Sequence, residues 1–241
     1  VIEVDVGMRR SGTRSFAQTL DLVRLIKTLP GLEFRGLMGY EGHAVMITDR
    51  KKRLEACSKA NETLVSIAAQ LSASGHRVEI VSGGGTGTYD MAGTYPGITE
   101  IEAGSYIFMD TKYATVGLPF EQSLFIVATV VSTPEANLAV IDTGLKTMTT
   151  EFGSPSPAFI IRQNVVGPVV ERADALVVEG VSEEHTKIGV PEGVTPLDLG
   201  DKIMLTPSHC CTTVNLYNDY KVFRENKFER IWPIEARGAS Q

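Results

Sequence analysis

The chain has 241 residues, of which 43% are hydrophobic and 22% are charged, the balance of a globular protein with a full core. Its formal net charge of −6 provides no basic surface, which argues against nucleic acid and anionic membranes as partners. No apolar run approaches the roughly 18 residues that a membrane span needs. The three cysteines, Cys57, Cys210 and Cys211, are odd in number and two are adjacent, which predicts a reduced, cytoplasmic protein.

Strand and helix signals alternate through the first 110 residues. Short strands are expected at 1–6, 34–38, 77–81 and 99–101, and amphipathic helices at 13–29 and 48–74. This alternation predicts parallel βα units, and four such strands would form half of an eight-stranded barrel. A buried strand at the very start needs a neighbour on each side, so we expect further sequence before Val1.

The pattern changes after about residue 115. A strongly β-prone run at 123–132 is followed by short apolar stretches at 137–141, 158–161, 175–178, 203–205 and 213–217, separated by Gly, Pro and Asp. They predict a mostly antiparallel β domain. Gly117-Leu118-Pro119 marks the expected boundary, which gives a barrel portion at 1–117 and a β domain at 118–241.

A glycine-rich segment, Ser82-Gly83-Gly84-Gly85-Thr86-Gly87-Thr88, follows the third predicted strand. Glycines let backbone N–H groups approach an anion closely, and the hydroxyls add donors. The segment is neither a Walker loop nor a clean dinucleotide fingerprint. A tight turn that needs glycine only for its geometry is the alternative, but the place at the carboxyl end of a strand favours phosphate binding.

Polar residues follow the first two predicted strands as well. Arg10 can direct a permanent positive charge at an anionic oxygen, although a solvated loop arginine is the alternative. Tyr40 can hydrogen-bond to a ring nitrogen. His43 can move protons, although a structural histidine is the simpler interpretation of this residue alone.

The segment Ser208-His209-Cys210-Cys211 is the strongest local signal. In an extended segment the side chains of His209 and Cys211 point the same way, and an imidazole with a thiolate forms half of a zinc-type site. Core residues near a strand end are the alternative. The polar cluster Ser182-Glu183-Glu184-His185 is expected to be a solvated loop.

In their order along the chain, these motifs resemble the D-threonine aldolase / D-serine dehydratase family. The resemblance covers essentially the whole chain and rests on Val4-Asp5-Val6-Gly7 with Arg10 and Gly12, Gly39-Tyr40-Glu41-Gly42-His43, residues 82–88, Glu102-Ala103-Gly104-Ser105-Tyr106, residues 182–185 and residues 207–216. It implies a pyridoxal 5'-phosphate (PLP) enzyme of fold type III. The chain would hold the second half of an alanine-racemase-like (β/α)8 PLP-binding barrel and then a C-terminal, mostly antiparallel β domain, in a homodimer.

The resemblance also implies residue roles. Arg10 would face the phenolic oxygen of PLP and Tyr40 its pyridine nitrogen. The phosphate would be held by Ser82, Gly83, Gly84, Gly85 and Thr86 with Gly104, Ser105 and Tyr106. His209 and Cys211 would bind a divalent metal beside the β-hydroxyl of the substrate, and the thiolate favours zinc over manganese or magnesium. The lysine that binds PLP would lie upstream of Val1, and Lys146 would be structural, so this chain alone is expected to be inactive.

The implied reaction is that of a lyase on D-3-hydroxy amino acids. Breaking Cα–H with metal-assisted loss of hydroxide makes a D-serine or D-3-hydroxyaspartate dehydratase. If a base, with His43 as the candidate, takes the hydroxyl proton, Cα–Cβ breaks and the enzyme is a D-threonine aldolase. The His-x-Cys pair resembles the dehydratases and favours dehydration. A PLP-dependent racemase without metal and a non-catalytic PLP-binding protein are the alternatives.

Overall fold

The computed structural model describes residues 1–164, 167–225 and 227–239. The chain divides into two compact units, and each is described by itself. The first unit comprises Val1–Tyr106 and Thr115–Pro119, and the second comprises Ile107–Ala114 and Phe120–Gln241. The domain boundary expected at residue 117 stays a prediction. Within the described residues, no helix has both the length and the apolar composition to cross a bilayer.

The first unit is built on four parallel strands in the order β1-β2-β3-β4. Their bounds are β1 (Ile2–Glu3), β2 (Gly36–Gly39), β3 (Ile80–Gly83) and β4 (Glu100–Ile101). The helices between them are α1 (Phe16–Ile26), α2 (Arg50–Ala73) and α3 (Tyr89–Ala92), and a 3₁₀ helix, η1 (Ser105–Ile107), follows β4. Because the strands are parallel, all four carboxyl ends reach the same edge of the sheet.

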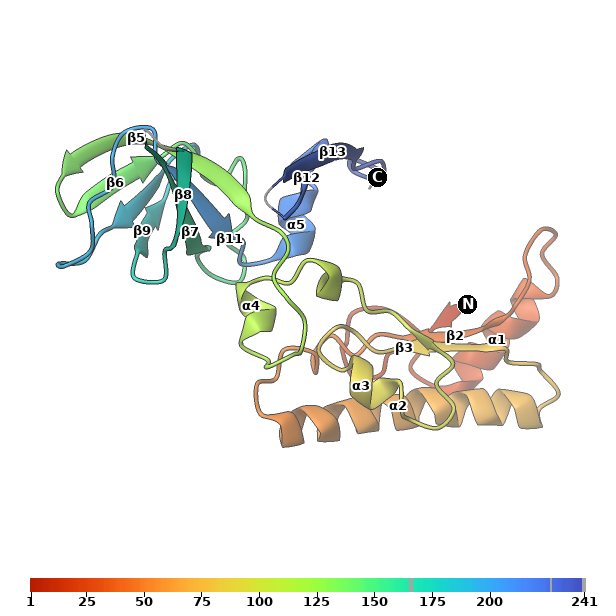
Figure 1. Ribbon diagram of the computed structural model, residues 1–241. Coiled ribbons are helices and arrows are strands. Elements are labelled where there is room, and N and C mark those ends of the chain that lie inside the picture. The colour runs from red at the N-terminus through yellow and green to blue at the C-terminus, as the bar shows by residue number, and fades with distance from the viewer. Residues whose placement is uncertain (165–166, 226, 240–241) are drawn as a thin grey trace. The chain divides into compact units, whose positions relative to one another are not determined.

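The two long helices, α1 and α2, each begin at a capping residue, and their bounds lie within the ranges expected from the sequence, 13–29 and 48–74. The side chains of Ser15 and Asp49 accept the backbone N–H groups of Gln18 and Lys52, respectively, which satisfies donors that a helix start leaves open. Helix α2 packs against β2 and β3 and lies along one face of the sheet (Figure 1). The core of the unit gathers between them, with Val23, Leu37, Leu64 and Leu71 fully buried.

Leu64 is a suitable test of this core because the same helix carries an exposed leucine. Leu54 lies on α2 as well, and it is 47% exposed. We expect Leu64→Ala to lower the free energy of unfolding by about 2–5 kcal/mol, the range for removing a buried leucine side chain. Leu54→Ala should have little effect. Chemical denaturation of the two variants measures the difference, and equal stabilities would contradict this description of the core.

The second unit is dominated by an antiparallel sheet of seven strands in the order β8-β7-β11-β5-β6-β10-β9. The bounds are β5 (Ile126–Glu135), β6 (Leu138–Ile141), β7 (Ser156–Asn164), β8 (Gly167–Arg172), β9 (Val177–Val181), β10 (Thr186–Gly189) and β11 (Lys202–Thr206). Alternate residues point inward, as Ile203 and Leu205 do on β11. Strands β7 and β9 contact each other, so the sheet curls around its core.

Short helices and a separate β-ribbon complete the second unit. They are α4 (Thr111–Ala114), α5 (Cys210–Val214), β12 (Asp219–Arg224) and β13 (Lys227–Pro233), and the two strands form their own antiparallel sheet (Figure 1). The strand expected at 213–217 is therefore wrong, because helix α5 occupies its beginning. The extended segment expected around His209 and Cys211 is also wrong, since Cys211 lies in the first turn of α5.

Candidate functional site

The predicted cofactor residues of the first unit follow the carboxyl ends of its strands. Tyr40 comes directly after β2, and the guanidinium carbon of Arg10 lies 5.7 Å from the centre of its ring. A Cβ atom at Gly85 would stand 3.0 Å from the Tyr40 ring, so the glycine loop packs against this tyrosine. His43 is exposed in the following turn, with its imidazole ring against Gly7. The structure thus brings Arg10, Tyr40 and the glycine loop together.

Glu41, which is not one of the predicted site residues, holds the glycine loop in place. Its side chain is fully buried. One carboxylate oxygen accepts the backbone N–H of Gly84 at 3.0 Å, and the other accepts that of Gly85 at 3.2 Å and the hydroxyl of Thr88. Glu41 therefore occupies two N–H groups that the sequence analysis assigned to a phosphate. The position of the loop is as expected, but these two donors are internal supports.

Donors for a phosphate group would have to come from other residues of the glycine loop or from the segment around Gly104. In the part of the chain that the structure describes, the backbone N–H groups of Thr86 and Gly87 have no protein acceptor. The backbone N–H of Tyr106 donates to the Thr86 hydroxyl oxygen at 3.2 Å, which joins the start of η1 to the glycine loop. Gly104, just before η1, has open space on the side where a Cβ would lie. A phosphate group fits this set of donors at an open glycine. Ser82 is engaged differently, since its hydroxyl donates to Glu100 at 2.8 Å.

The predicted metal ligands come together in the second unit. One ligand atom each from His209, Cys210 and Cys211 lies within 4.8 Å of the other two. The two sulfur atoms are 4.0 Å apart, close to the roughly 3.8 Å that two thiolates would have on a tetrahedral zinc with Zn–S bonds of about 2.3 Å. The cluster therefore fits a thiophilic divalent ion. The structure adds Cys210, which is buried, to the predicted pair of His209 and Cys211.

The imidazole of His209 is held on two sides. Its Nδ1 lies 3.2 Å from Oδ2 of Asp110, a fully buried residue, and its ring meets the edge of Phe152 at a centroid distance of 4.9 Å. Its Nε2 lies 3.8 Å from the carboxylate of Glu151, beyond hydrogen-bonding distance. The hydrogen bond with Asp110, followed by that with Cys211, raises the pKa of His209 to about 10. Asp110 was missed in the sequence because it stands 99 positions from His209.

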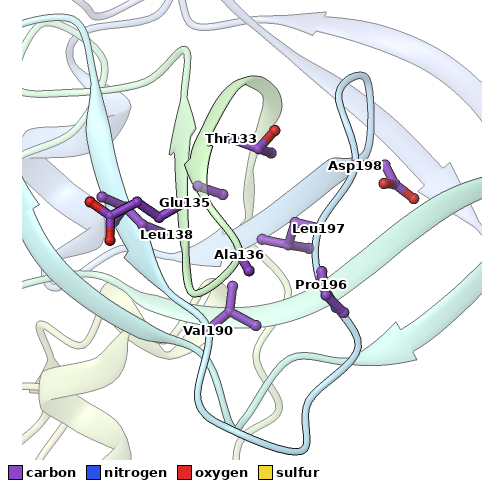
Figure 2. Close-up of a pocket in the computed structure, with 9 residues that line it drawn as sticks. Thr133, Glu135, Ala136, Leu138, Val190, Pro196, Leu197 and Asp198 are labelled. Carbon is purple, nitrogen blue, oxygen red and sulfur yellow. The ribbon is translucent and has the colours of Figure 1, made fainter.

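Lys146 and the polar segment 182–185 lie together in the second unit. Lys146 forms ion pairs with Glu184 at 2.7 Å and Glu183 at 3.7 Å, in agreement with a structural role. Residues 182–185 form the exposed turn between β9 and β10. A pocket between the β5–β6 turn and the loop before β11 is lined by Leu138, Val190 and Leu197, with carboxylates at its rim (Figure 2). It contains none of the predicted site residues.

Comparison with known proteins matches the two parts of the chain to two family models. Residues 1–112 match the model "Alanine racemase, N-terminal domain", and residues 123–223 match "Putative serine dehydratase domain". Among curated proteins, a D-threonine aldolase of an Arthrobacter species is 36% identical and is aligned with 100% of this chain. A 3-hydroxy-D-aspartate aldolase of Paracoccus denitrificans is 32% identical and is aligned with 98%.

A solved structure of a D-threonine aldolase also matches the chain over nearly its whole length. The crystal structure of a D-threonine aldolase from Filomicrobium marinum superimposes with a TM-score of 0.88 at 29% identity, over 98% of this chain and 62% of that one. This match confirms the expected alanine-racemase-like fold with its C-terminal β-rich region. The chain spans 61% of the Arthrobacter protein and 60% of the Paracoccus protein, about three-fifths of the relatives that it matches.

Proposed function

The chain belongs to the D-threonine aldolase / D-serine dehydratase family. We propose that it forms part of a PLP- and divalent-metal-dependent lyase that acts on D-3-hydroxy amino acids. The observation that carries the proposal is the cluster of His209, Cys210 and Cys211, which presents an imidazole and two sulfur atoms within 4.8 Å of one another. A PLP enzyme that broke bonds without metal assistance would need no such cluster.

The residues of the first unit would bind and orient PLP. The N–H groups of Thr86 and Gly87, with the open loop at Gly104, would hold the phosphate, while Glu41 keeps the glycine loop in place. Arg10 and Tyr40 would lie beside the ring. When bound, PLP supplies the stabilisation of negative charge at the substrate Cα. Orientation of the substrate then decides which bond to Cα breaks.

The residues of the second unit would bind the metal, with His209 and Cys211 as its first ligands. When bound, the ion supplies Lewis acidity toward the β-oxygen of the substrate. A site with a thiolate suits zinc better than manganese or magnesium. Because Nδ1 of His209 faces Asp110, Nε2 would be the nitrogen that binds the ion.

Aldol cleavage is the first candidate reaction, because the two relatives described above, at 36% and 32% identity, carry aldolase names. In that reaction His43 would accept the proton of the β-hydroxyl, so that D-threonine gives glycine and acetaldehyde. Dehydration, in which D-serine gives pyruvate and ammonia, is the second candidate. It is favoured by the thiolate in the cluster and by the match of residues 123–223 to a serine dehydratase domain.

Product analysis tests the proposal. The intact protein is incubated with PLP, Zn²⁺ and either D-threonine or D-serine, and the products are identified by chromatography. Glycine with acetaldehyde would establish aldol cleavage, and a 2-oxo acid with ammonia would establish dehydration. Conversion of D-serine only to L-serine, or of D-threonine only to L-allo-threonine, would instead establish a racemase. Binding of PLP without formation of any product would indicate a non-catalytic PLP-binding protein. A homodimeric state and a cytoplasmic location stay predictions.

A further inference from the structure

Asp110 lies 99 positions before His209 in the sequence, yet its side chain hydrogen-bonds to both His209 and Cys210 of the metal cluster. Its Oδ2 lies 3.2 Å from Nδ1 of His209 and accepts the backbone N–H of Cys210 at 3.1 Å. Its Oδ1 accepts the backbone N–H of Tyr113 at 2.8 Å, in the first turn of α4. One buried carboxylate thus fixes both the imidazole and the start of the helix that carries the two cysteines.

The arrangement determines which nitrogen of His209 keeps its proton when a metal ion binds. Each carboxyl oxygen of Asp110 accepts a backbone N–H, Oδ1 that of Tyr113 and Oδ2 that of Cys210, which is the pattern of a carboxylate. A carboxylate can only accept hydrogen bonds, and therefore Nδ1 must be the donor. In a neutral imidazole the lone pair is then on Nε2, which is the form that a metal ligand needs.

We propose that Asp110 is the positioning residue of the metal site: it holds His209 as the tautomer with Nδ1 protonated, directs Nε2 to the ion, and keeps the backbone of Cys210 and Cys211 in place. This inference rests on the proposed function, because it takes His209 and Cys211 as ligands. It adds a residue that no local motif contains. A purely structural role, as the cap of α4, is the competing explanation.

Asp110→Asn separates the two explanations. The amide oxygen of asparagine can still accept the N–H of Tyr113, so the cap of α4 is kept. The amide nitrogen would then face His209 and Cys210, where it cannot accept a hydrogen bond, and it would favour a proton on Nε2. We expect affinity for Zn²⁺ to fall about 10- to 100-fold, as for other outer partners of metal-bound histidines, whereas a role limited to the cap of α4 would leave the affinity unchanged.

The experiment measures Zn²⁺ affinity of the intact protein by competition with a chromophoric chelator. Asp174→Asn is the matched control, since Asp174 is an exposed aspartate paired with Arg172 on the same unit, and it should bind Zn²⁺ like the wild type. If Asp110→Asn kept its affinity for Zn²⁺ while His209→Ala lost it, the role of Asp110 would be overturned and the assignment of the metal ligands would stand. Unchanged affinity in His209→Ala would instead overturn the metal assignment itself.

A second measurement needs no substitution and so does not depend on the folding of a variant. In the zinc-loaded wild-type protein labelled with ¹⁵N-histidine, the nitrogen chemical shifts of His209 identify the metal-bound and the protonated nitrogen. We expect zinc on Nε2 and the proton on Nδ1. Zinc on Nδ1 would overturn the role of Asp110, because Asp110 faces that nitrogen.

Discussion

Replacing His209 with alanine is expected to abolish turnover of D-3-hydroxy amino acids while leaving PLP affinity unchanged. The imidazole would be one of the first ligands of the metal, so its loss should weaken Zn²⁺ binding by more than the roughly 10- to 100-fold that loss of an outer partner costs. The glycine loop and Tyr40 belong to the first unit, whereas His209 belongs to the second. PLP absorbance and product formation measure the two effects separately.

His185→Ala is the matched control for this substitution. His185 is an exposed histidine in the turn between β9 and β10, in the same unit as His209. Its alanine variant should retain both Zn²⁺ affinity and turnover. If His209→Ala also retained turnover, the cluster would not be the catalytic metal site. Loss of PLP binding in His209→Ala would show that the substitution disturbs more than the metal.

Replacing Glu41 with alanine is expected to destabilise the first unit strongly. The substitution leaves the backbone N–H groups of Gly84 and Gly85 buried without an acceptor, and each such group costs about 1–3 kcal/mol. The free energy of unfolding should therefore fall by roughly 2–6 kcal/mol. The glycine loop should also hold PLP less tightly. Chemical denaturation and a PLP titration measure the two effects.

Glu55→Ala provides the control, because Glu55 is an exposed glutamate on α2 of the same unit. Its removal should change stability by less than about 0.5 kcal/mol. Glu41→Gln keeps the size of the side chain and one acceptor oxygen, so it should be less destabilising than Glu41→Ala. Equal stability of the Glu41→Ala and Glu55→Ala variants would contradict the supporting role of Glu41.

The sequence predicts the regular elements of the first unit because their signals are local. Apolar spacing indicates α1 and α2, and glycine marks the ends of β2 and β3. The ribbon of β12 and β13 was missed because Phe223, Phe228 and Trp232 are exposed among charged residues, so no buried alternation indicates a strand. Helix α5 was missed because its first N–H is accepted by Asp110, a partner 100 positions away.

The candidate site divides in the same way. Some site residues could be predicted from the sequence because they stand at strand ends or in distinctive motifs. These are Arg10, Tyr40, the glycine loop and the His209 segment. Glu41 and Asp110 could not be assigned their roles, because a buried carboxylate is recognised only through the backbone N–H groups that surround it. Glu41 does have one local signal, since it stands between two predicted site residues, Tyr40 and His43.

Removing and restoring the metal tests the proposed function most directly. The intact protein, saturated with PLP, is treated with a chelator, dialysed, and assayed with D-threonine and with D-serine before and after addition of Zn²⁺. The metal-dependent lyase proposed here requires that turnover disappear with the metal and return with it, while PLP stays bound throughout. Turnover that is undiminished in the metal-free protein would contradict it.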